Sequence, residues 1–471
     1  MQLSRRLFLG AMGAAAGFRA FGAPQKGKPE LKLALLSDPH VQNAATQAKI
    51  RKIFEYARAN DVDGVLIAGD IANDGRDDQL KMVADAWFEV FPNSKGADGE
   101  RVEIIGCYGN RDFRQSSVTK PGQREQEAAI SIFTHPNAIW QELFHDPIGD
   151  NVCVRHVKGY PVVVAHWRFQ NKLNEFWPDL KKKFDPSKTF FYVQHPHLSG
   201  TVFNGFKADA GISTKILSAY PNAIALSGHS HRSITDERAL WHDSFVSLAG
   251  GSGALVSTYG DRPYENHGNL GLKKGVPPPR IPHMAEALTT HGLSQVMIMS
   301  LYPDAIEIVR HDCGFDESAG PDWILPRRNG RDVRCPSMRG KGDAGQPFGG
   351  VTNPGVPQFP VDAKVSVAER MGQNREGGQE AQFVVSFPPA QPSARASGRA
   401  MEYEVSAQAA DGSEIVKEYV LATNYLHPCK EVKGPVECVF GKDSIPQGVK
   451  PVWCVTPCNF LHQPGKSIRS T

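Results

Sequence analysis

The chain has 471 residues, more than a single hydrophobic core usually organises, so we expect two or three domains. Its hydrophobic fraction of 40% and charged fraction of 22% are those of a globular protein. The formal net charge is +3, and because the first 22 residues hold Arg5, Arg6 and Arg19 and no acid, the remainder is neutral. This balance argues against a protein that coats nucleic acid, since such binding depends on clustered lysine and arginine.

The N-terminus, SRRLFLGAMGAAAGFRAFGAPQ, has a pair of arginines followed by a short run of small apolar residues. It resembles a twin-arginine export signal, with Gly10 where such signals often carry lysine. An amphipathic helix or an uncleaved anchor are the alternatives, but the run is too short and too rich in Gly and Ala to span a bilayer comfortably. We predict a signal peptide over residues 1–23 and a periplasmic or secreted mature protein without a stable membrane span.

Eight cysteines in an exported chain permit disulfides. Cys107 and Cys153 lie in apolar, strand-like stretches and are expected to be buried thiols, whereas Cys313 and Cys335 flank a loop and form one candidate pair. Four cysteines crowd the C-terminal region, where we expect at least one bridge; a zinc site is less expected because no CxxC pair is present. These four are Cys429, Cys438, Cys454 and Cys458.

From residue 31 to about residue 310, short apolar runs alternate with helical patterns. In AKIRKIFEYARAN, the residues Ile50, Ile53, Phe54 and Ala57 fall on one helical face. Runs such as VDGVLIAGD, RVEIIGCYGN, YPVVVAHW and NAIALSGHSH are rich in β-branched residues, as in strands covered on both faces. The pattern predicts an α/β fold over residues 30–315, a layered β-sandwich flanked by helices.

Residues 316–360 are rich in Gly, Pro and Arg without a sustained period, and we predict a connection that lies on the surface. Beyond them, roughly 110 residues of short segments alternate at period two, which predicts a C-terminal all-β sandwich domain over residues 361–471. Its closing run, VTPCNFLHQPGKSIR, resembles the last strands of a fibronectin type III-like module.

Polar clusters follow five of the predicted strands at the points where the strands end. They are Ser37-Asp38-Pro39-His40, Gly69-Asp70, Gly109-Asn110-Arg111-Asp112, His195-Pro196-His197 and Gly228-His229-Ser230-His231. Because ligands gather at the carboxyl ends of strands in α/β sheets, we expect these clusters to meet at one edge. Each cluster alone is weak evidence, but chance alone would rarely place five such clusters at successive strand ends.

This collection of carboxylate, imidazole and amide groups suits two divalent transition metals close together. Mn, Fe and Zn accept such ligands, and a central carboxylate can bridge a pair. A hydroxide between two metals can attack phosphorus in line while the metals neutralise charge on the phosphoryl oxygens. We also expect the glycines before Asp70, Asn110 and His229 to let the backbone turn sharply without a Cβ clash.

The order and spacing of the clusters resemble the calcineurin-like metallophosphoesterase family: Asp-x-His, Gly-Asp, Gly-Asn-His-Asp/Glu, His and Gly-His-x-His. The resemblance covers roughly residues 31–312 and implies a two-metal phosphoesterase. It implies Asp38, His40 and His231 as ligands of the first metal, Asn110, His195 and His229 as ligands of the second, and Asp70 as the bridge. His195 is preferred to His197 because it falls directly at the strand end.

Arg111 departs from the common family pattern, in which a histidine follows the asparagine. The resemblance implies that this histidine stabilises the transition state or protonates the leaving oxygen, whereas an arginine grips phosphate but donates no proton at ordinary pH. On one interpretation Arg111 is a catalytic and substrate-binding clamp, oriented by Asp112, for leaving groups that need little protonation. On the other it marks a weakened relative, which the seven intact ligand positions disfavour.

Further substrate contacts are predicted at His166, at the end of PVVVAHW, and at His197, although a packed or solvated histidine is the alternative at both. The loop STYGDRPYENHGNLG carries Arg262 and His267. We interpret it either as a roof over the pocket that selects the substrate or as a surface excursion.

The sequence therefore predicts an exported, dinuclear metal-dependent phosphoesterase that hydrolyses phosphoester, phosphodiester or phosphoanhydride bonds. Its cofactors would be two divalent ions, Mn, Fe or Zn, and its substrate a phosphorylated small molecule or envelope component, with no nucleic acid expected. The alternative is a non-catalytic surface-binding protein that uses the C-terminal β-sandwich on a degenerate phosphoesterase scaffold.

Overall fold

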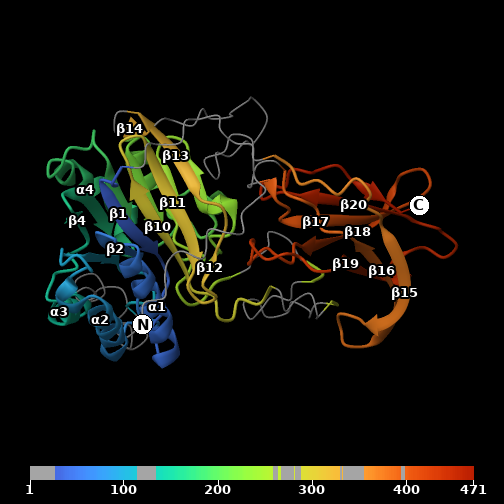
Figure 1. Cartoon of the computed structure of the whole chain (residues 1–471), viewed down its shortest axis with the longest axis horizontal. Helices are drawn as coiled ribbons and strands as arrows, with labels where there is room; N and C mark the ends of the chain where they lie inside the picture. Colours follow the sequence, from blue (N-terminus) through green and yellow to red (C-terminus); the bar gives the residue numbers. More distant parts are fainter. Residues whose placement is uncertain are drawn as a thin grey trace.

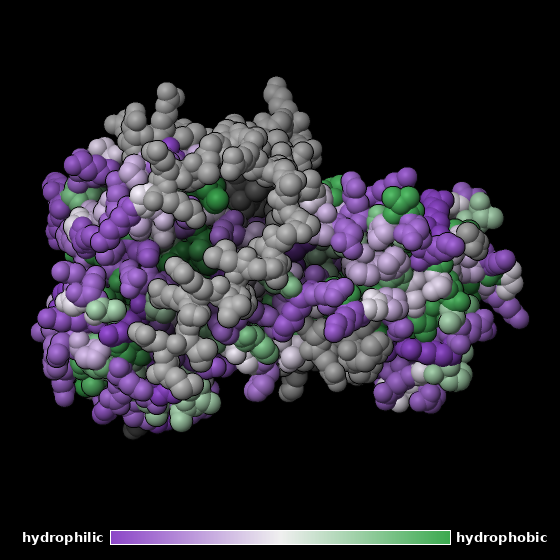
Figure 2. Space-filling model, viewed as in Figure 1, coloured by the Kyte–Doolittle hydropathy of each residue, from purple (hydrophilic) through white to green (hydrophobic). Residues whose placement is uncertain are grey.

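The computed structural model describes the larger part of the chain. The described residues are 27–113, 134–257, 264–266, 280–281, 288–328, 331–332, 355–393 and 398–470. The predicted signal peptide, residues 1–23, lies outside them, as do Arg262, His267 and Cys335. Within the described residues, no helix combines the length and apolar character needed to cross a membrane. The face drawn in Figure 2 is mainly hydrophilic, with small apolar patches scattered over both ends of the molecule.

Two sheets pack face to face in the N-terminal part of the molecule (Figure 1). The first has the order β14-β13-β11-β10-β1-β2-β3, with β12 paired to β11. Its strands are β1 (Leu31–Leu36), β2 (Gly64–Ala68), β3 (Glu103–Cys107), β10 (Gln295–Leu301), β11 (Ala305–Asp312), β12 (Glu317–Ser318), β13 (Trp323–Arg328) and β14 (Arg331–Asp332).

The second sheet has the order β4-β5-β6-β7-β9-β8. Its strands are β4 (Val152–Val157), β5 (Tyr160–Ala165), β6 (Phe190–Val193), β7 (Ala223–Ser227), β8 (Leu240–His242) and β9 (Val246–Ala249). The neighbours β1, β2 and β3 run parallel, and so do β5, β6, β7 and β9. Each parallel set therefore brings its carboxyl ends to a single edge.

Strands of the first sheet are apolar on both faces because both faces are covered. In β1, Leu33 and Leu35 pack between the sheets, whereas Ala34 and Leu36 pack in the core beneath the helices. Those helices are α1 (Ala44–Ala59), α2 (Asp77–Val90) and α3 (Thr134–Phe144), while α4 (Leu173–Leu180) and α5 (Ile212–Leu217) accompany the second sheet. Asn43 caps α1 through a capping box with Thr46, and the helical face predicted from sequence is buried as expected.

The C-terminal part contains two antiparallel sheets around a core of their own (Figure 1). One has the order β15-β16-β19 and the other β18-β17-β20-β21. The strands are β15 (Ser366–Gln373), β16 (Gln379–Phe387), β17 (Glu402–Gln408), β18 (Glu414–Leu421), β19 (Val436–Gly441), β20 (Val452–Cys458) and β21 (Ile468–Arg469). The predicted fold class, a layered α/β unit followed by a β-sandwich, is confirmed, while the fibronectin type III-like character stays a prediction.

The segment interpreted as a surface connection begins differently from expectation. Residues 317–332 contain β12, β13 and β14, and β13 pairs with β11 in the first sheet. In β13, Trp323 and Leu325 are buried in the core between the sheets, whereas Ile324 between them is 57% exposed. Three apolar residues followed by proline and arginine were too short a pattern to outweigh the surrounding composition.

The predicted C-terminal disulfide is absent from the described part of the chain. Cys429, Cys438 and Cys454 are free thiols, which leaves no pair among the four C-terminal cysteines. Cys438 lies in β19 and Cys454 in β20, so each is buried in a different sheet. Cys107 is a buried free thiol, as predicted.

Replacing Leu325 by alanine should lower the free energy of unfolding by about 2–5 kcal/mol, because it leaves a cavity between the two sheets. The exposed neighbour supplies the control: Ile324→Ala should change it by no more than about 0.5 kcal/mol. Chemical denaturation of both variants measures the difference. Equal losses would contradict the burial of alternate β13 side chains in this core.

Candidate metal centre

Seven side chains from the strand-end loops of both sheets meet at one place. Asp38 and His40 follow β1, Asp70 follows β2, Asn110 follows β3, His195 follows β6, and His229 and His231 follow β7. Two groups have ligand atoms that all lie within 4.8 Å of one another. One is Asp38, His40, Asp70 and His231, and the other is Asp70, His195 and His229, so Asp70 belongs to both.

The contacts between these side chains are short. His231 Nε2 lies 3.0 Å from Asp38 Oδ1 and 3.1 Å from His40 Nε2. Asp70 Oδ2 lies 3.5 Å from His40 Nε2 and 3.3 Å from His195 Nε2. Asn110 joins the second group, with Oδ1 3.2 Å from His195 Nε2.

Three of the histidines are oriented by their other ring nitrogen. Nδ1 of His195 lies 2.8 Å from the Ala68 carbonyl and Nδ1 of His231 lies 3.1 Å from the Leu255 carbonyl. Nδ1 of His40 lies 3.2 Å from Asn73 Oδ1. A carbonyl oxygen only accepts, so each Nδ1 carries a hydrogen and each Nε2 faces the cluster, where its lone pair would bind a cation that replaces the proton.

The two carboxylates each hold one oxygen with protein donors and point the other inward. Asp38 Oδ2 accepts the backbone N–H of His229 at 2.8 Å, and Asp70 Oδ1 accepts the backbone N–H of Arg111 at 2.7 Å. Asp38 Oδ1 is buried and has no hydrogen-bond partner among the described residues. Converging lone pairs around such an oxygen fit a bound cation, and imidazole with carboxylate suits Mn, Fe or Zn.

Residues 31–233 match the model of the calcineurin-like phosphoesterase family. They form a calcineurin-like phosphoesterase domain. The matched range includes all seven clustered side chains, and it confirms for this domain the resemblance inferred from the motifs.

Solved structures similar to the chain include two phosphatases. A dimetal phosphatase from Danio rerio is 11% identical with a TM-score of 0.35, over 63% of this chain and 99% of that one. Purple acid phosphatase PPD1 from yellow lupin, Lupinus luteus, is 12% identical with a TM-score of 0.41, over 63% of this chain and 54% of that one. GAP50 of Plasmodium, an anchor in the inner membrane complex, is 13% identical with a TM-score of 0.36, over 64% of this chain and 90% of that one. No curated protein matches the chain.

Five of the seven clustered residues adopt an uncommon backbone conformation. Positive φ angles of 43° to 70° occur at Asp38, His40, Asp70, His229 and His231. Side-chain-bearing residues rarely adopt this left-handed region, and such strain persists where the surrounding structure enforces it, often at functional sites. The turn that the sequence assigned to glycine is therefore made largely by the ligand residues themselves.

Two of the glycines serve close packing instead. A Cβ on Gly109 would lie 2.3 Å from Asp70 Oδ1, and one on Gly228 would lie 2.5 Å from Asp38 Oδ2. Neither glycine has a positive φ, whereas Gly69, with φ of +84°, does. The prediction that Gly109 and Gly228 permit a sharp turn is therefore wrong. These positions need glycine because a Cβ would occupy the space beside the carboxylates.

The buried carboxylates dominate the electrostatics of the site. Burial acts to raise the pKa of Asp38, but His231 and His195 outweigh it and hold that pKa well below its ordinary value. Burial acts to lower the pKa of His195, but Asp70 and Asp38 raise it to about 9. Burial and His195 lower the pKa of His229 to about 3. The cluster is thus an electronegative site that favours positive charge.

Asp112 does not orient the Arg111 side chain as predicted. Its buried carboxylate accepts backbone N–H groups from Ala72 and Gly109, both at 2.8 Å, and from Ile71 at 3.3 Å. Within the described part of the chain it forms no ion pair with Arg111. Burial and the neighbouring Asp70 raise its pKa to about 7. Asp112 therefore joins the loops after β2 and β3. Among the described residues, Arg111 contacts the Asp70 carboxylate through its backbone N–H.

The two histidines predicted as substrate contacts are enclosed by protein. His166 is 0% exposed and accepts the Tyr108 N–H at Nδ1, while its Nε2 lies 3.1 Å from the Gly149 carbonyl. His197 is also 0% exposed, with hydroxyls of Ser227 and Ser230 at its two ring nitrogens. Burial lowers the pKa of His166 to about 4 and that of His197 to about 3. Both predictions of a substrate contact are wrong, because packing, not strand-end position, decides whether a histidine reaches the site.

Two neighbours of the site were missed from sequence. The partly exposed Trp167 ring lies 5.4 Å from the ring of His229 and 5.8 Å from that of His195. The exposed Lys207 donates from Nζ to the His229 carbonyl at 3.0 Å. Trp167 ends the run PVVVAHW, so its position after a strand could have identified it from the sequence. Lys207 lies in an irregular loop, where no sequence pattern indicated a site residue.

Ser257 and residues 264–266 are the described parts of the expected roof, and residues 264–266 lie against the β-sandwich. Glu265 donates its N–H to the Tyr419 carbonyl at 2.8 Å, and Asn266 exchanges two hydrogen bonds with the Leu421 backbone. These residues therefore attach the loop to β18, and the remainder of the roof lies outside the described residues.

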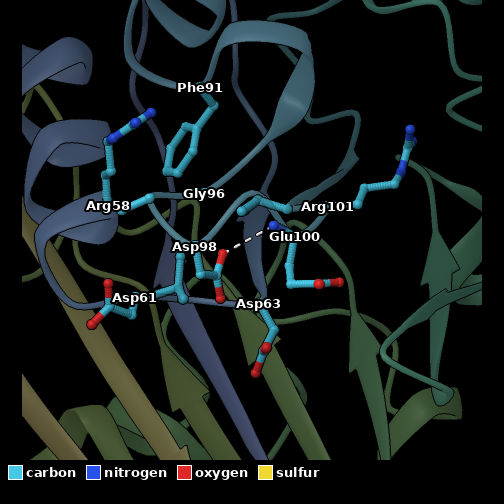
Figure 3. A pocket seen from close by; sticks show the side chains of 11 residues that line it. Arg58, Asp61, Asp63, Phe91, Gly96, Asp98, Glu100 and Arg101 are labelled. Atoms are coloured by element: carbon cyan, nitrogen blue, oxygen red, sulfur yellow. Dashed lines mark hydrogen bonds between the residues drawn. The ribbon is translucent and has the colours of Figure 1, made fainter.

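A small pocket elsewhere in the domain is distinct from this site (Figure 3). Its lining comes from the chain just before β2 and just before β3, so it lies at the amino ends of these strands. The lining residues are Arg58, Asp61, Val62, Asp63, Phe91, Gly96, Ala97, Asp98, Glu100, Arg101 and Val102. The cluster of candidate metal ligands lies after the carboxyl ends of the same strands.

Replacing Asp70 by asparagine should lower bound metal from about two ions per chain to one or fewer, because both groups share this carboxylate. Metal content after loading with Mn or Zn, measured by mass spectrometry, tests this. Asp85→Asn is the control, since Asp85 is an exposed carboxylate on α2 that pairs with Lys81 and belongs to neither ligand group. Full metal content in Asp70→Asn would contradict the shared role.

Proposed function

We propose that the protein is an exported, dinuclear metal-dependent hydrolase of phosphoester, phosphodiester or phosphoanhydride bonds. The observation that carries the proposal is the convergence of Asp38, His40, Asp70, Asn110, His195, His229 and His231, with Asp70 shared by both groups. The phosphoesterase domain match supports the same reaction class. The alternative of a degenerate binding scaffold is not favoured, because the ligand set is complete and oriented.

Two divalent ions held there would supply a nucleophilic water at neutral pH and would neutralise charge on the phosphoryl oxygens. The chain's own residues prepare this chemistry. Carbonyls fix the rings of His40, His195 and His231 with Nε2 inward, and backbone N–H groups hold Asp38 and Asp70. Fixed groups need no reorganisation during the reaction, which lowers its barrier.

Arg111 and Lys207 are proposed to bind the substrate. Arg111 is tied to the site by its backbone N–H on Asp70 and is partly exposed, and Lys207 is exposed beside His229. Arginine binds phosphate bidentately and lysine as a point charge. Neither donates a proton readily, so leaving groups that need little protonation remain favoured: activated aryl groups, phosphates and nucleotides. Trp167 offers an apolar wall on the side of the second group.

Export by the N-terminal twin-arginine-type signal is part of the proposal and rests on sequence alone. The proposed location is the periplasm or the exterior of the cell, where the substrate would be a phosphorylated small molecule or an envelope component.

Turnover on a panel of leaving groups tests the function. The panel holds an aryl phosphate monoester, an aryl phosphodiester, a nucleotide sugar and an alkyl phosphate, with Mn, Zn or Fe supplied. We expect activity on activated esters, diesters or anhydrides that is lost in Asp70→Asn. Arg111→His should raise turnover on the alkyl phosphate relative to the aryl ester, because histidine can protonate a poor leaving group.

No turnover on any substrate, with two ions bound, would count against the enzyme. Rapid alkyl phosphate hydrolysis by the wild type would count against the role given to Arg111, because it would require a proton donor that this residue does not provide.

Lys207→Ala should raise KM about tenfold, the equivalent of roughly 1.4 kcal/mol for one charge-assisted contact, with metal content unchanged. Lys215→Ala, which removes an exposed lysine on α5, is the control and should leave KM as it is. Steady-state kinetics on the best substrate of the panel measures both. An unchanged KM in Lys207→Ala would contradict a substrate-binding role for this lysine.

A further inference from the structure

The segment that follows His231 is buried although it is rich in charge. Every residue from 232 to 239 is at most 6% exposed, and the segment includes Arg232, Asp236, Glu237 and Arg238. A buried loop has to satisfy its backbone polar groups and its charges inside the protein. The partners of this segment therefore determine its conformation, and with it the position of His231 at its start.

Some of these partners belong to the first sheet. Gln295 accepts the Ile234 N–H at 3.0 Å and donates to the Ser233 hydroxyl at 2.9 Å. Arg310 donates to the Ile234 carbonyl and to Glu237, both at 2.9 Å. These bonds fix the middle of the segment to β10 and β11.

The other partners belong to the C-terminal sandwich. Arg399, 6% exposed, donates from Nη2 to the Thr235 carbonyl at 2.7 Å, and its guanidinium lies 4.5 Å from the centroid of the Phe460 ring. The Tyr425 hydroxyl donates to Asp236 Oδ2 at 3.1 Å. Thr235 and Asp236 lie four and five residues beyond His231, so the sandwich holds the chain close to a candidate ligand.

A second connection reaches the other side of His231. Its Nδ1–H donates to the Leu255 carbonyl at 3.1 Å, and its own carbonyl accepts the Ser257 N–H at 2.7 Å. Val256, between these two partners, packs in an apolar cluster with Tyr425 and Phe460 of the sandwich. The orientation of the ring thus depends on a segment that is packed against the C-terminal part of the molecule.

We propose that the C-terminal β-sandwich is a structural component of the metal centre. Its residues Arg399 and Tyr425 are positioning residues that hold the segment after His231, and with it the His231 ring, in place. The proposal rests on the proposed function, because it takes the clustered side chains to be a metal site. Groups that orient a metal ligand are worth about 10- to 100-fold in metal affinity, although they never contact the ion.

Tyr425→Phe is the test, because it removes the hydrogen bond to Asp236 and keeps the ring in the apolar cluster. Tyr403→Phe is the matched control: Tyr403 is equally buried in the sandwich, but its hydroxyl accepts the Ala390 N–H, remote in sequence from the segment 232–239. In calorimetric titrations with Mn²⁺, Tyr425→Phe should lower the affinity for one of the two ions about tenfold. Tyr403→Phe should leave both affinities as in the wild type, even where it lowers the melting temperature.

Hydrogen exchange of the metal-free protein gives a readout that needs neither metal nor activity. Tyr425→Phe should accelerate exchange in residues 232–239, with exchange in β1 unchanged, and Tyr403→Phe should not. Arg399→Lys keeps the charge but has a shorter side chain, which weakens the hydrogen bond to the Thr235 carbonyl. It should therefore move both readouts in the same direction to a smaller extent than Arg399→Met.

Wild-type affinity and wild-type exchange in Tyr425→Phe would overturn the positioning role, as would equal weakening by both tyrosine variants. The failure of the proposed function has a different signature. Wild-type protein that takes up no metal would overturn the assignment of a metal centre and the inference that depends on it, whereas normal uptake that is indifferent to Tyr425 overturns the inference alone.

Discussion

Two carboxylates, Asp38 and Asp70, are buried side by side at the edge where the two sheets meet, with exposed fractions of 0% and 1%. Like charges placed together out of water are unfavourable unless other groups compensate them. The compensation comes from backbone N–H groups of His229 and Arg111 and from imidazole rings that follow strands of both sheets. No single loop supplies these partners, so the site requires the sheets to pack in this register.

The same constraint explains the strained backbone and the absent Cβ atoms. The candidate ligand atoms converge from the ends of five strands, and directly after β1 and β2 the chain turns inward through left-handed φ angles at Asp38 and Asp70. Gly109 and Gly228 leave room for the carboxylates at distances that a side chain would not permit. Such strain is tolerated because the surrounding packing enforces it, and it leaves a site that is already arranged before a substrate arrives.

The C-terminal sandwich extends this arrangement beyond the phosphoesterase domain. Buried arginine and tyrosine side chains of the sandwich contact the segment after His231, and an apolar cluster is shared by both parts. Buried polar contacts specify one arrangement more strictly than apolar packing, since an unpaired partner would carry the full cost of desolvation. This gives the sandwich a physical connection to the site that requires no contact with substrate.

The sequence by itself determined which side chains meet and what kind of fold brings them together. The buried face of α1 and the ends of β1, β2, β3, β6 and β7 were readable because helical periodicity, apolar strands and the residues after them are local properties. The convergence of the clusters followed from a general rule about the carboxyl ends of parallel strands.

Only the tertiary structure decided what each residue contacts. His166 and His197 end strands just as His195 does, yet long-range packing encloses the first two and turns the third toward Asp70. Asp112 contacts backbone amides from neighbouring loops rather than the arginine beside it. Three further contacts join residues far apart in the chain: Lys207 with the His229 carbonyl, β13 with β11, and Arg399 with the Thr235 carbonyl. Composition and spacing do not reveal such long-range pairs, because the free energy of the whole packed structure determines which residues come into contact.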